Sequence, residues 1–320
     1  MPAPVLRLAV AGAAHPHVSY VLDELALRTD VQLVGVSDPD PSLARSLGVP
    51  AYRDHLSLLA AERPDVVAVA GIYSERGAVV ADSLRAGAHV LADKPLCTKL
   101  SSLDDIARAQ DETGRSVSLL LEKRGHPGTL AARSLLAEGT LGALTLVAAS
   151  APHKLNRDSR PSWFLDPGTY GGVIGDLAVH DIDLVLWLSG ALEGTVSAVG
   201  GRWHGAVLLR AGDVAATIEV SWLTPASAPW HGDYRMRLTG TSGTADLLWS
   251  REELVAETHD RPLWSVALPG GERPAAAALD AFVAGVEPPI STAASLLATR
   301  IALLAQDSAD NSGVVHRWAA

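Results

Sequence analysis

Two short motifs contain residue types that can move protons. The first runs from Gly171 to Leu188, where Asp176 and His180 stand four residues apart behind a cluster of glycines. Because residues at i and i+4 share one face of a helix, we predict that these two side chains project toward the same point. The second motif is Asp93-Lys94-Pro95, which follows a buried-strand pattern. A lysine, an aspartate and a histidine that meet in a cleft can add a proton to an alcohol or remove one.

Each of these groups has more than one role open to it. The imidazole of His180 has an ordinary pKa of about 6.5, so it can accept a hydroxyl proton near neutral pH. Lys94 stabilises a developing alkoxide if it is cationic, and it is itself the base if burial removes its charge. Asp176 either fixes the imidazole or accepts a hydrogen bond from a substrate hydroxyl. The structural alternative for His180 is a satisfied core histidine, and Asp183 is left unassigned.

The chain from Leu6 to about Leu120 alternates short apolar runs with helical patterns. Such βα units predict a doubly wound parallel sheet with helices on both faces. We expect strands at Leu6–Ala11, Gln32–Ser37, Val66–Ala70, His89–Ala92 and Ser116–Leu121. We expect helices at Val18–Arg28, Pro41–Leu47, Leu56–Glu62, Ala78–Ala86 and Leu103–Thr113.

After a helix expected near Leu130–Glu138, strands follow one another without helices between them. This pattern predicts a large, mostly antiparallel open sheet with helices on one face. The expected strands are Val196–Trp203, Ala206–Arg210, Val214–Trp222, Tyr234–Gly240, Thr244–Trp249, Glu252–Glu257 and Leu263–Leu268, and the closing helices are Ala275–Ala284 and Ala293–Asp307. We therefore expect two domains, residues 1–122 and 123–320, and the last helices can pack back on the first domain.

The turn after the first strand indicates a dinucleotide site. A glycine between a strand and a helix lets the backbone turn tightly and lets helix amides face a pyrophosphate, as in Rossmann domains. In the turn Gly12–His17, Gly12 holds the first place of the G-x-G-x-x-G pattern and Ala14 takes the second. Asp38 ends the second strand, where a carboxylate can bind the adenosine ribose hydroxyls and repel a 2′-phosphate. The pattern favours NAD as the cofactor, with NADP as the alternative because Arg45 follows closely. The structural alternatives are an ordinary strand-to-helix turn for Gly12–His17 and a helix cap or turn aspartate for Asp38.

The composition limits which partners the protein can bind and where in the cell it is expected. The 320 residues suffice for two domains, and the 36 acidic against 26 basic residues give a net charge of -10 without a basic block. This excludes a nucleic-acid footprint and disfavours anionic membrane surfaces. The single cysteine, Cys97, excludes an internal disulfide and is expected to be a buried thiol. Because no apolar run reaches about 18 residues, we expect no membrane span and a cytoplasmic location.

Taken in order, these motifs resemble those of the Gfo/Idh/MocA oxidoreductases, the family of glucose–fructose oxidoreductase and inositol dehydrogenase. The matching features are the turn at Gly12, the segment Ala88–Leu96, Arg124 with Pro127, and the segment from Gly171 to Trp187. The second feature resembles the family's glutamate-lysine-proline motif, with an aspartate in place of glutamate. The resemblance extends over nearly the whole chain, from about Leu6 to the last helices.

The resemblance implies that Lys94 touches both the nicotinamide ribose side and the reacting hydroxyl. It implies that Asp176 orients the substrate and that His180 exchanges the hydroxyl proton. The residues expected to bind the cofactor are Gly12, Ala14, His15, Asp38, Gly71, Ile72, Arg76, Asp93, Lys94 and Pro95. Two departures accompany them, since Gly71-Ile72-Tyr73 replaces the usual Thr-Pro-Asn and Arg76 stands where a histidine is common.

A polar loop with an aromatic end, residues 151–164, precedes the Asp176 motif. Its side chains could surround a sugar with donors and stack a tryptophan on the sugar face; the alternative is a solvated loop with a core tryptophan. The candidate substrate residues are Arg124, His153, Arg157 and Trp163. Because two histidines at i and i+2 rarely bind a metal alone, we expect no metal at His15 and His17 and place His15 beside the cofactor.

The sequence therefore predicts an NAD(P)-dependent dehydrogenase or reductase that transfers a hydride between the cofactor and a secondary alcohol of a sugar, inositol or related polyol. We expect a homodimer or homotetramer formed through the C-terminal sheet, with Trp203, Trp222 and Trp249 on its open face unless they fill the core. One alternative uses transient oxidation for elimination, epimerisation or glycoside cleavage. Another is a non-catalytic nucleotide- or sugar-binding regulator, which the complete lysine, aspartate and histidine set disfavours.

Overall fold

A computed structural model describes residues 5–320, which divide into two compact units. The first unit comprises the chain up to Leu121 together with residues 163–171 and 273–299. The second unit comprises residues 122–162, 172–272 and 300–320. Within the described residues, no helix is both long and apolar enough to cross a membrane.

The six strands of the first unit form one parallel sheet. Their spatial order is β3 (Ala51–Tyr52), β2 (Val31–Ser37), β1 (Leu6–Ala11), β4 (Val66–Val69), β5 (His89–Ala92) and β6 (Val117–Leu119). The chain winds outward from β1 in one direction and from β4 in the other, which confirms the predicted doubly wound sheet. The two-residue edge strand β3 is not among the predicted strands.

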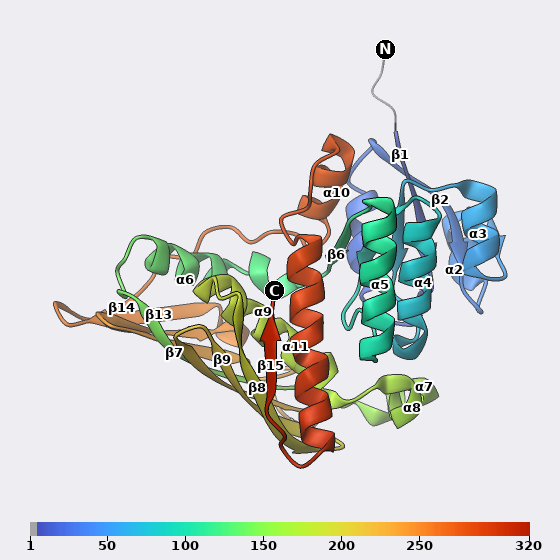
Figure 1. The fold of residues 1–320 in the computed structure, drawn as a ribbon. Helices are drawn as coiled ribbons and strands as arrows, with labels where there is room; N and C mark the ends of the chain where they lie inside the picture. The colour runs from blue at the N-terminus through green and yellow to red at the C-terminus, as the bar shows by residue number, and fades with distance from the viewer. Residues whose placement is uncertain (1–4) are drawn as a thin grey trace. The chain divides into compact units, whose positions relative to one another are not determined.

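Helices cover the first unit's sheet, and α4 and α5 lie side by side (Figure 1). The first helical turn of α4 precedes the predicted helix because Gly77 interrupts the apolar pattern there. From the far end of the chain, α10 adds Leu279 and Phe282 to the core that surrounds Leu8 and Val10 of β1. The helices are α1 (Val18–Leu25), α2 (Ser42–Leu47), α3 (His55–Glu62), α4 (Tyr73–Arg85), α5 (Leu100–Thr113), α7 (Ser162–Leu165), α8 (Pro167–Tyr170) and α10 (Ala276–Ala284).

The second unit contains a nine-stranded sheet that is antiparallel except where β7 and β10 pair. This confirms the predicted mostly antiparallel sheet. Strand β7 is missing from the prediction because its alanine- and serine-rich sequence has low strand propensity. In spatial order the strands are β14 (Arg261–Ser265), β13 (Glu253–Thr258), β12 (Gly243–Leu248), β11 (Arg235–Gly240), β7 (Leu144–Pro152), β10 (Val214–Ser221), β9 (His204–Ala211), β8 (Glu193–Gly201) and β15 (His316–Ala319).

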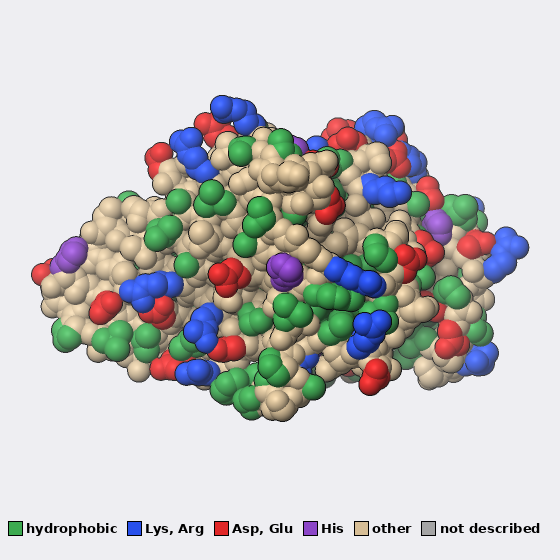
Figure 2. Space-filling view, turned by 90° about the horizontal axis from the view of Figure 1, so that it is seen from below, with side chains coloured by type: hydrophobic (Ala, Val, Ile, Leu, Met, Phe, Trp, Pro, Cys, Tyr) green, Lys and Arg blue, Asp and Glu red, His purple; other side chains and the backbone are tan. Residues whose placement is uncertain are grey.

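One face of this sheet is buried and the other is exposed. Residues of β9 and β10 alternate between buried and exposed, and helices α6 (Pro127–Ala137) and α9 (Val179–Ser189) pack on the sheet. Trp222 and Trp249 are each 6% exposed, so the expectation of an open tryptophan face is wrong for both. Both belong to the core, and the indole N–H of Trp249 donates to the buried Thr129 hydroxyl at 3.0 Å. On the molecular face shown in Figure 2, hydrophobic side chains are scattered among Lys, Arg, Asp and Glu.

The segment that carries Asp176 is not a regular α-helix. Residues Ile174–Ala178 form a π-helical turn that leads into α9. The prediction of one continuous helix over Asp176 and His180 is therefore wrong at its start. A π turn holds one more residue than an α turn, so the segment before α9 is wound more loosely than the predicted helix. The second unit also contains η1 (Glu122–Gly125) and the C-terminal part of α11 (Thr292–Asp310).

Candidate active site

The first unit gathers the predicted cofactor residues along the carboxyl edge of its sheet. Gly12 follows β1, Asp38 follows β2, Gly71 lies just beyond β4 and Asp93 follows β5. The strand order reverses between β1 and β4, and open α/β sheets bind their ligands at such a point. The topology therefore brings together residues that are up to 81 positions apart in sequence, from Gly12 to Asp93.

Gly12 and Gly71 approach each other too closely for side chains. Gly12 has φ +79°, and a Cβ atom on it would lie 2.6 Å from the Cα of Gly71. The Gly12 amide donates to the Ser37 carbonyl at 2.7 Å, which closes the turn against β2. The glycine retained from the dinucleotide pattern is thus required by both the backbone angle and the contact with Gly71.

Most backbone amides of this turn donate hydrogen bonds to other groups of the protein. The first three amides of α1 donate to the carbonyls of residues 15–17, and the His15 amide donates to Ala70. The Ala13 amide donates to Asp38 Oδ2 at 2.7 Å, while Asp38 Oδ1 accepts the Asp40 amide at 2.9 Å. That the start of α1 faces a pyrophosphate stays a prediction. Ala14 lies at the centre of the turn, and Asp38 closes it.

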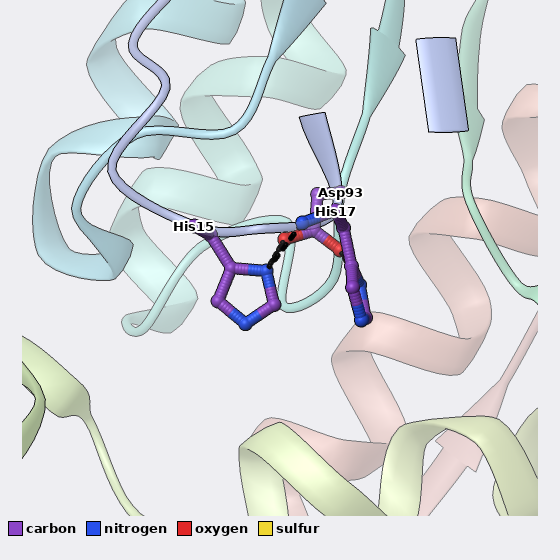
Figure 3. A group of neighbouring side chains, drawn as sticks. All are labelled: His15, His17 and Asp93. Carbon is purple, nitrogen blue, oxygen red and sulfur yellow. Dashed lines mark hydrogen bonds and ion pairs between the residues drawn. The ribbon is translucent and has the colours of Figure 1, made fainter. Parts of the chain in front are cut away.

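Asp93 is the centre of a buried polar cluster (Figure 3). Its two carboxylate oxygens lie 2.8 Å from Nδ1 of His17 and 2.9 Å from Nδ1 of His15. Burial alone would raise the pKa of Asp93, but the Arg76 guanidinium and the two histidines hold it well below its usual range. Burial lowers the pKa of His15 to about 4, against the opposite effect of Asp93, so the ring is neutral at pH 7.

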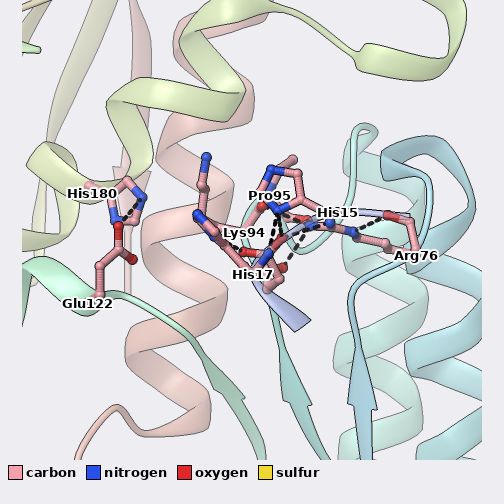
Figure 4. Close-up of polar contacts among 9 residues, drawn as sticks. His15, His17, Arg76, Lys94, Pro95, Glu122 and His180 are labelled. Atoms are coloured by element: carbon pink, nitrogen blue, oxygen red, sulfur yellow. Dashed lines mark hydrogen bonds and ion pairs between the residues drawn. The ribbon is translucent and has the colours of Figure 1, made fainter. Parts of the chain in front are cut away.

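Arg76 holds the Asp93-Lys94-Pro95 motif in place (Figure 4). Its Nη2 donates to Asp93 Oδ2 at 2.8 Å, and its Nη1 lies 2.7 to 3.1 Å from the carbonyls of all three motif residues. Its Nε donates to the Gly71 carbonyl at 2.8 Å. The guanidinium is fully buried, so these contacts compensate its charge and its donors. Arg76 therefore neutralises the aspartate that stands in place of the family's glutamate.

His15, His17 and Asp93 also form a cluster with the residue types of a metal site, their candidate ligand atoms lying within 4.8 Å of one another. Both oxygens of the carboxylate already have partners here, since Oδ1 contacts His17 and Oδ2 contacts His15 and Arg76. The cationic guanidinium beside the carboxylate opposes the binding of a further cation. The contacts support a hydrogen-bonded cluster, and the expectation of no metal stays a prediction.

Tyr73 packs against Trp163, one of the candidate substrate residues. The Tyr73 side chain is fully buried, with its ring 5.0 Å from that of Trp163 and 5.8 Å from that of Tyr170. The Arg76 guanidinium lies 4.4 Å from the centre of the Tyr73 ring. The tyrosine that replaces the family's asparagine thus anchors α7 and α8 to the first unit. Trp163 is half-buried in this aromatic cluster.

In the second unit, three consecutive residues of η1 contact α9 through charged groups. Glu122 Oε1 lies 3.5 Å from Nε2 of His180, as Figure 4 shows. Lys123 Nζ lies 2.8 and 3.0 Å from the two oxygens of Asp181. Asp181 is fully buried, and Asp176 and His180 are 1% and 5% exposed. Buried charges need partners, and η1 supplies them in register with the first turns of α9.

Arg124 completes this set through Asp183. Its Nε and Nη2 donate to the two Asp183 oxygens at 2.7 and 2.6 Å, a bidentate contact. Burial raises the pKa of Asp183 even though Arg124 opposes that effect. Arg124, a candidate substrate residue, thus binds a carboxylate of α9. Sequence reasoning missed Glu122 and Lys123, although three charged residues directly after a buried strand are a signal that could have found them.

The other predicted substrate residues lie at the end of the second unit's sheet. His153 Nδ1 lies 2.9 Å from the Ala151 carbonyl, and its ring is 4.6 Å from that of Tyr234. Arg157 is exposed. The glycine cluster ahead of Asp176 serves packing, since a Cβ on Gly172 would lie 2.3 Å from the Gln306 side chain, whose Oε1 accepts the Ile174 amide.

Comparison with known proteins identifies the class. A profile of the "Oxidoreductase family, NAD-binding Rossmann fold" matches residues 6–120, and one of the "GFO/IDH/MocA C-terminal domain" matches residues 129–246. The chain belongs to the Gfo/Idh/MocA oxidoreductase family, which confirms the resemblance read from the sequence.

Individual relatives share about a quarter of the residues. A dTDP-3,4-didehydro-2,6-dideoxy-alpha-D-glucose 3-reductase of Streptomyces antibioticus is 27% identical, over 81% of this chain and 80% of the relative. A trans-1,2-dihydrobenzene-1,2-diol dehydrogenase of Bos taurus is 28% identical, over 77% and 75%. The fold matches that of an inositol dehydrogenase homolog complexed with NAD+ from Azotobacter vinelandii, with a TM-score of 0.81 at 20% identity over 99% and 98% of the two chains.

The Arg76 contacts generate a stability prediction. Arg76→Met leaves the Asp93 carboxylate buried without its cation, so the free energy of unfolding should fall by about 3–5 kcal/mol. Adding Asp93→Asn to that variant should restore part of the loss. Arg85→Met removes an exposed arginine from the same helix and should cost less than about 1 kcal/mol. Urea unfolding followed by circular dichroism measures all three. Equal losses for Arg76→Met and Arg85→Met would contradict the assignment.

The lowered pKa of His15 generates a pH prediction. The folded pKa of about 4 lies below the unfolded value of about 6.5, so the unfolded chain takes up this proton first as the pH falls. Stability is therefore lost from about pH 6.5 down to about pH 4, with a drop of about 2 kcal/mol between pH 7 and pH 5 from this group. His15→Asn should remove that drop, and His259→Asn, at an exposed position, should keep it. An unchanged pH slope in His15→Asn would refute the prediction.

Proposed function

We propose that the protein transfers a hydride between NAD and a secondary alcohol of a sugar, inositol or related polyol. The observation that carries the proposal is that Lys94, whose backbone carbonyl accepts a hydrogen bond from Arg76, follows the carboxyl end of a strand in the Rossmann sheet. Asp176 and His180, buried in the second unit, supply the other reactive groups of the proposal. The printed names of the relatives support the substrate class, because a deoxyglucose derivative and a cyclic diol both carry ring carbons bonded to oxygen.

The first unit's residues fit a dinucleotide. The Gly12 turn lies directly against Gly71, which allows a ligand to approach both backbones, and Asp38 stands at the end of β2. We assign Asp38 to the adenosine ribose hydroxyls, where its charge disfavours a 2′-phosphate and therefore favours NAD over NADP. His15 presents a neutral ring beside this turn, which suits contact with uncharged parts of the cofactor. When bound, the nicotinamide supplies the hydride acceptor or donor.

The remaining residues manage the proton and the substrate. In oxidation, the alcohol loses a hydride from carbon and a proton from oxygen, and we assign the proton to His180. Lys94 stabilises the charge that develops on the oxygen, and Asp176 orients the substrate through a hydroxyl. In the reverse direction His180 returns the proton. Arg124 and Lys123 act indirectly, because they fix Asp183 and Asp181 on the helix that carries His180.

The cofactor assignment predicts a specific binding defect. Asp38→Ala should weaken NAD+ binding about tenfold, equivalent to about 1.4 kcal/mol, and should weaken NADP+ binding less. Asp40→Ala changes the charge by the same amount in the same loop and should leave NAD+ binding nearly unchanged. Fluorescence titration of the purified protein with both nucleotides measures the constants. NAD+ binding that is equally tight in wild type and Asp38→Ala would contradict the role of Asp38.

The reaction assignment predicts loss of turnover. NADH formation from inositols, glucosides and free sugars should be detectable by absorbance, and His180→Asn or Lys94→Met should lower kcat at least about 100-fold with NAD+ affinity retained. His204→Asn, at an exposed position of the sheet, serves as the control. Full activity in His180→Asn would remove that residue from the mechanism. Product formation without net NADH would replace hydride transfer by transient oxidation as the overall reaction.

A further inference from the structure

The imidazole of His15 uses one of its two nitrogens within the first unit. Its Nδ1 lies 2.9 Å from Asp93 Oδ2, and the backbone amide of His15 donates to the Ala70 carbonyl at 2.9 Å. Among the described residues, no group lies within hydrogen-bond distance of Nε2, and this atom is not one of the fully buried side-chain atoms that lack a partner. Nε2 therefore keeps an opening through which a ligand can reach it.

The charge of Asp93 fixes which nitrogen of His15 carries the proton. Although Asp93 is buried, Arg76 and the two histidines hold its pKa well below the usual range, so the carboxylate only accepts hydrogen bonds. Burial lowers the pKa of His15 to about 4, so the ring is neutral at pH 7 and has one N–H. Because Nδ1 faces the carboxylate, that proton is on Nδ1 and Nε2 has a lone pair. The His17 amide is 3.4 Å from the same Nδ1, too far to compete.

The neighbours of His15 also fix the direction of Nε2. The ring of His17 lies 4.4 Å away at 87°, and that of Tyr73 lies 5.7 Å away. Turning the His15 ring over would place a carbon atom beside Asp93 and lose the hydrogen bond. The second nitrogen of His15 consequently points away from Asp93, as Figure 3 shows.

We propose that Nε2 of His15 accepts a hydrogen bond from an uncharged donor in the nicotinamide half of the cofactor, either a hydroxyl of its ribose or its carboxamide. This inference rests on the proposed function for the identity of the ligand. A lone pair on Nε2 attracts an O–H or N–H group, whereas it repels the pyrophosphate oxygens, which only accept hydrogen bonds. His15 thus recognises a different part of the dinucleotide from the phosphates that the glycine pattern serves.

The order of the strands indicates the half of the cofactor that His15 meets. Asp38, which we assign to the adenosine ribose, follows β2, whereas Asp93 follows β5. Strands β1 and β4 lie between them. Neighbouring strands are about 4.8 Å apart, so β2 and β5 are roughly 14 Å apart. Lys94, which the proposed function places at the reacting oxygen, directly follows Asp93. The contact with Asp93 therefore places the His15 ring on the nicotinamide side.

The first test observes the ring in the wild-type protein. At about pH 8, ¹⁵N-histidine spectra should show the Nδ1–H tautomer for His15, assigned by the signals that His15→Asn removes, or His15→Gln if the first variant does not fold. Saturating NAD+ should shift the resonance of the unprotonated Nε2, and saturating ADP should leave it in place. A neutral Nε2–H tautomer overturns the proposal, and so does an Nε2 resonance that saturating NAD+ does not move.

Binding constants then separate the two donors. His15→Asn keeps an N–H that can donate to Asp93 but has no atom at the position of Nε2. It should bind NAD+ about five- to tenfold more weakly than wild type and should bind ADP equally well. A matching loss for ADP-ribose identifies the ribose hydroxyl, and an unchanged constant for ADP-ribose identifies the carboxamide. His55→Asn, at another histidine of the first unit that contacts a carboxylate, is the control and should change none of these constants.

Three binding results would overturn the proposal. A loss that is as large for ADP as for NAD+ would place the contact outside the nicotinamide half. Unchanged NAD+ binding in folded His15→Asn would remove the contact and leave the proposed function standing. Failure of the wild-type protein to bind NAD+ would reject the cofactor assignment and the ligand of His15 together, whichever tautomer the spectra show.

Discussion

The first unit depends on one buried charge, the carboxylate of Asp93. A carboxylate with no exposure to water is stable only if cations or donors surround it. Arg76 supplies them from α4, and His15 and His17 supply them from the turn after β1. These contacts fix the turn after β1, the start of α4 and the backbone on both sides of Lys94. The backbone position of Lys94 is therefore a consequence of how the aspartate before it is neutralised.

The second unit also contains buried carboxylates that need cations, and these lie on one helix. Asp181 and Asp183 are buried on α9, and the cations that compensate them come from successive positions of η1. In both units, charged side chains that the sequence places among the candidate ligand contacts form ion pairs with buried neighbours instead. Arg76 pairs with Asp93, and Arg124 pairs with Asp183.

Much of the fold could be predicted from the sequence, because strands such as β1 and β5 are continuous apolar runs bounded by turns. Strand β7 was missed because alanine and serine do not signal a strand, although it lies at the centre of its sheet. The sequence predicted which residue types make up the candidate site, but not which of these residues contact one another. Nothing local reveals that Arg76 reaches Asp93 or that Arg124 meets Asp183, since these contacts join segments that only the tertiary fold brings together.

In the π turn over Ile174–Ala178, the number of residues matters as well as their types. Because this turn holds one residue more than an α-helical turn, a single-residue deletion within it would restore regular winding without disturbing the ends. A deletion at Leu177 or Ala178 would leave Asp176 and His180 in the chain but place them three residues apart, so the spacing of the two groups can be changed without exchanging either side chain.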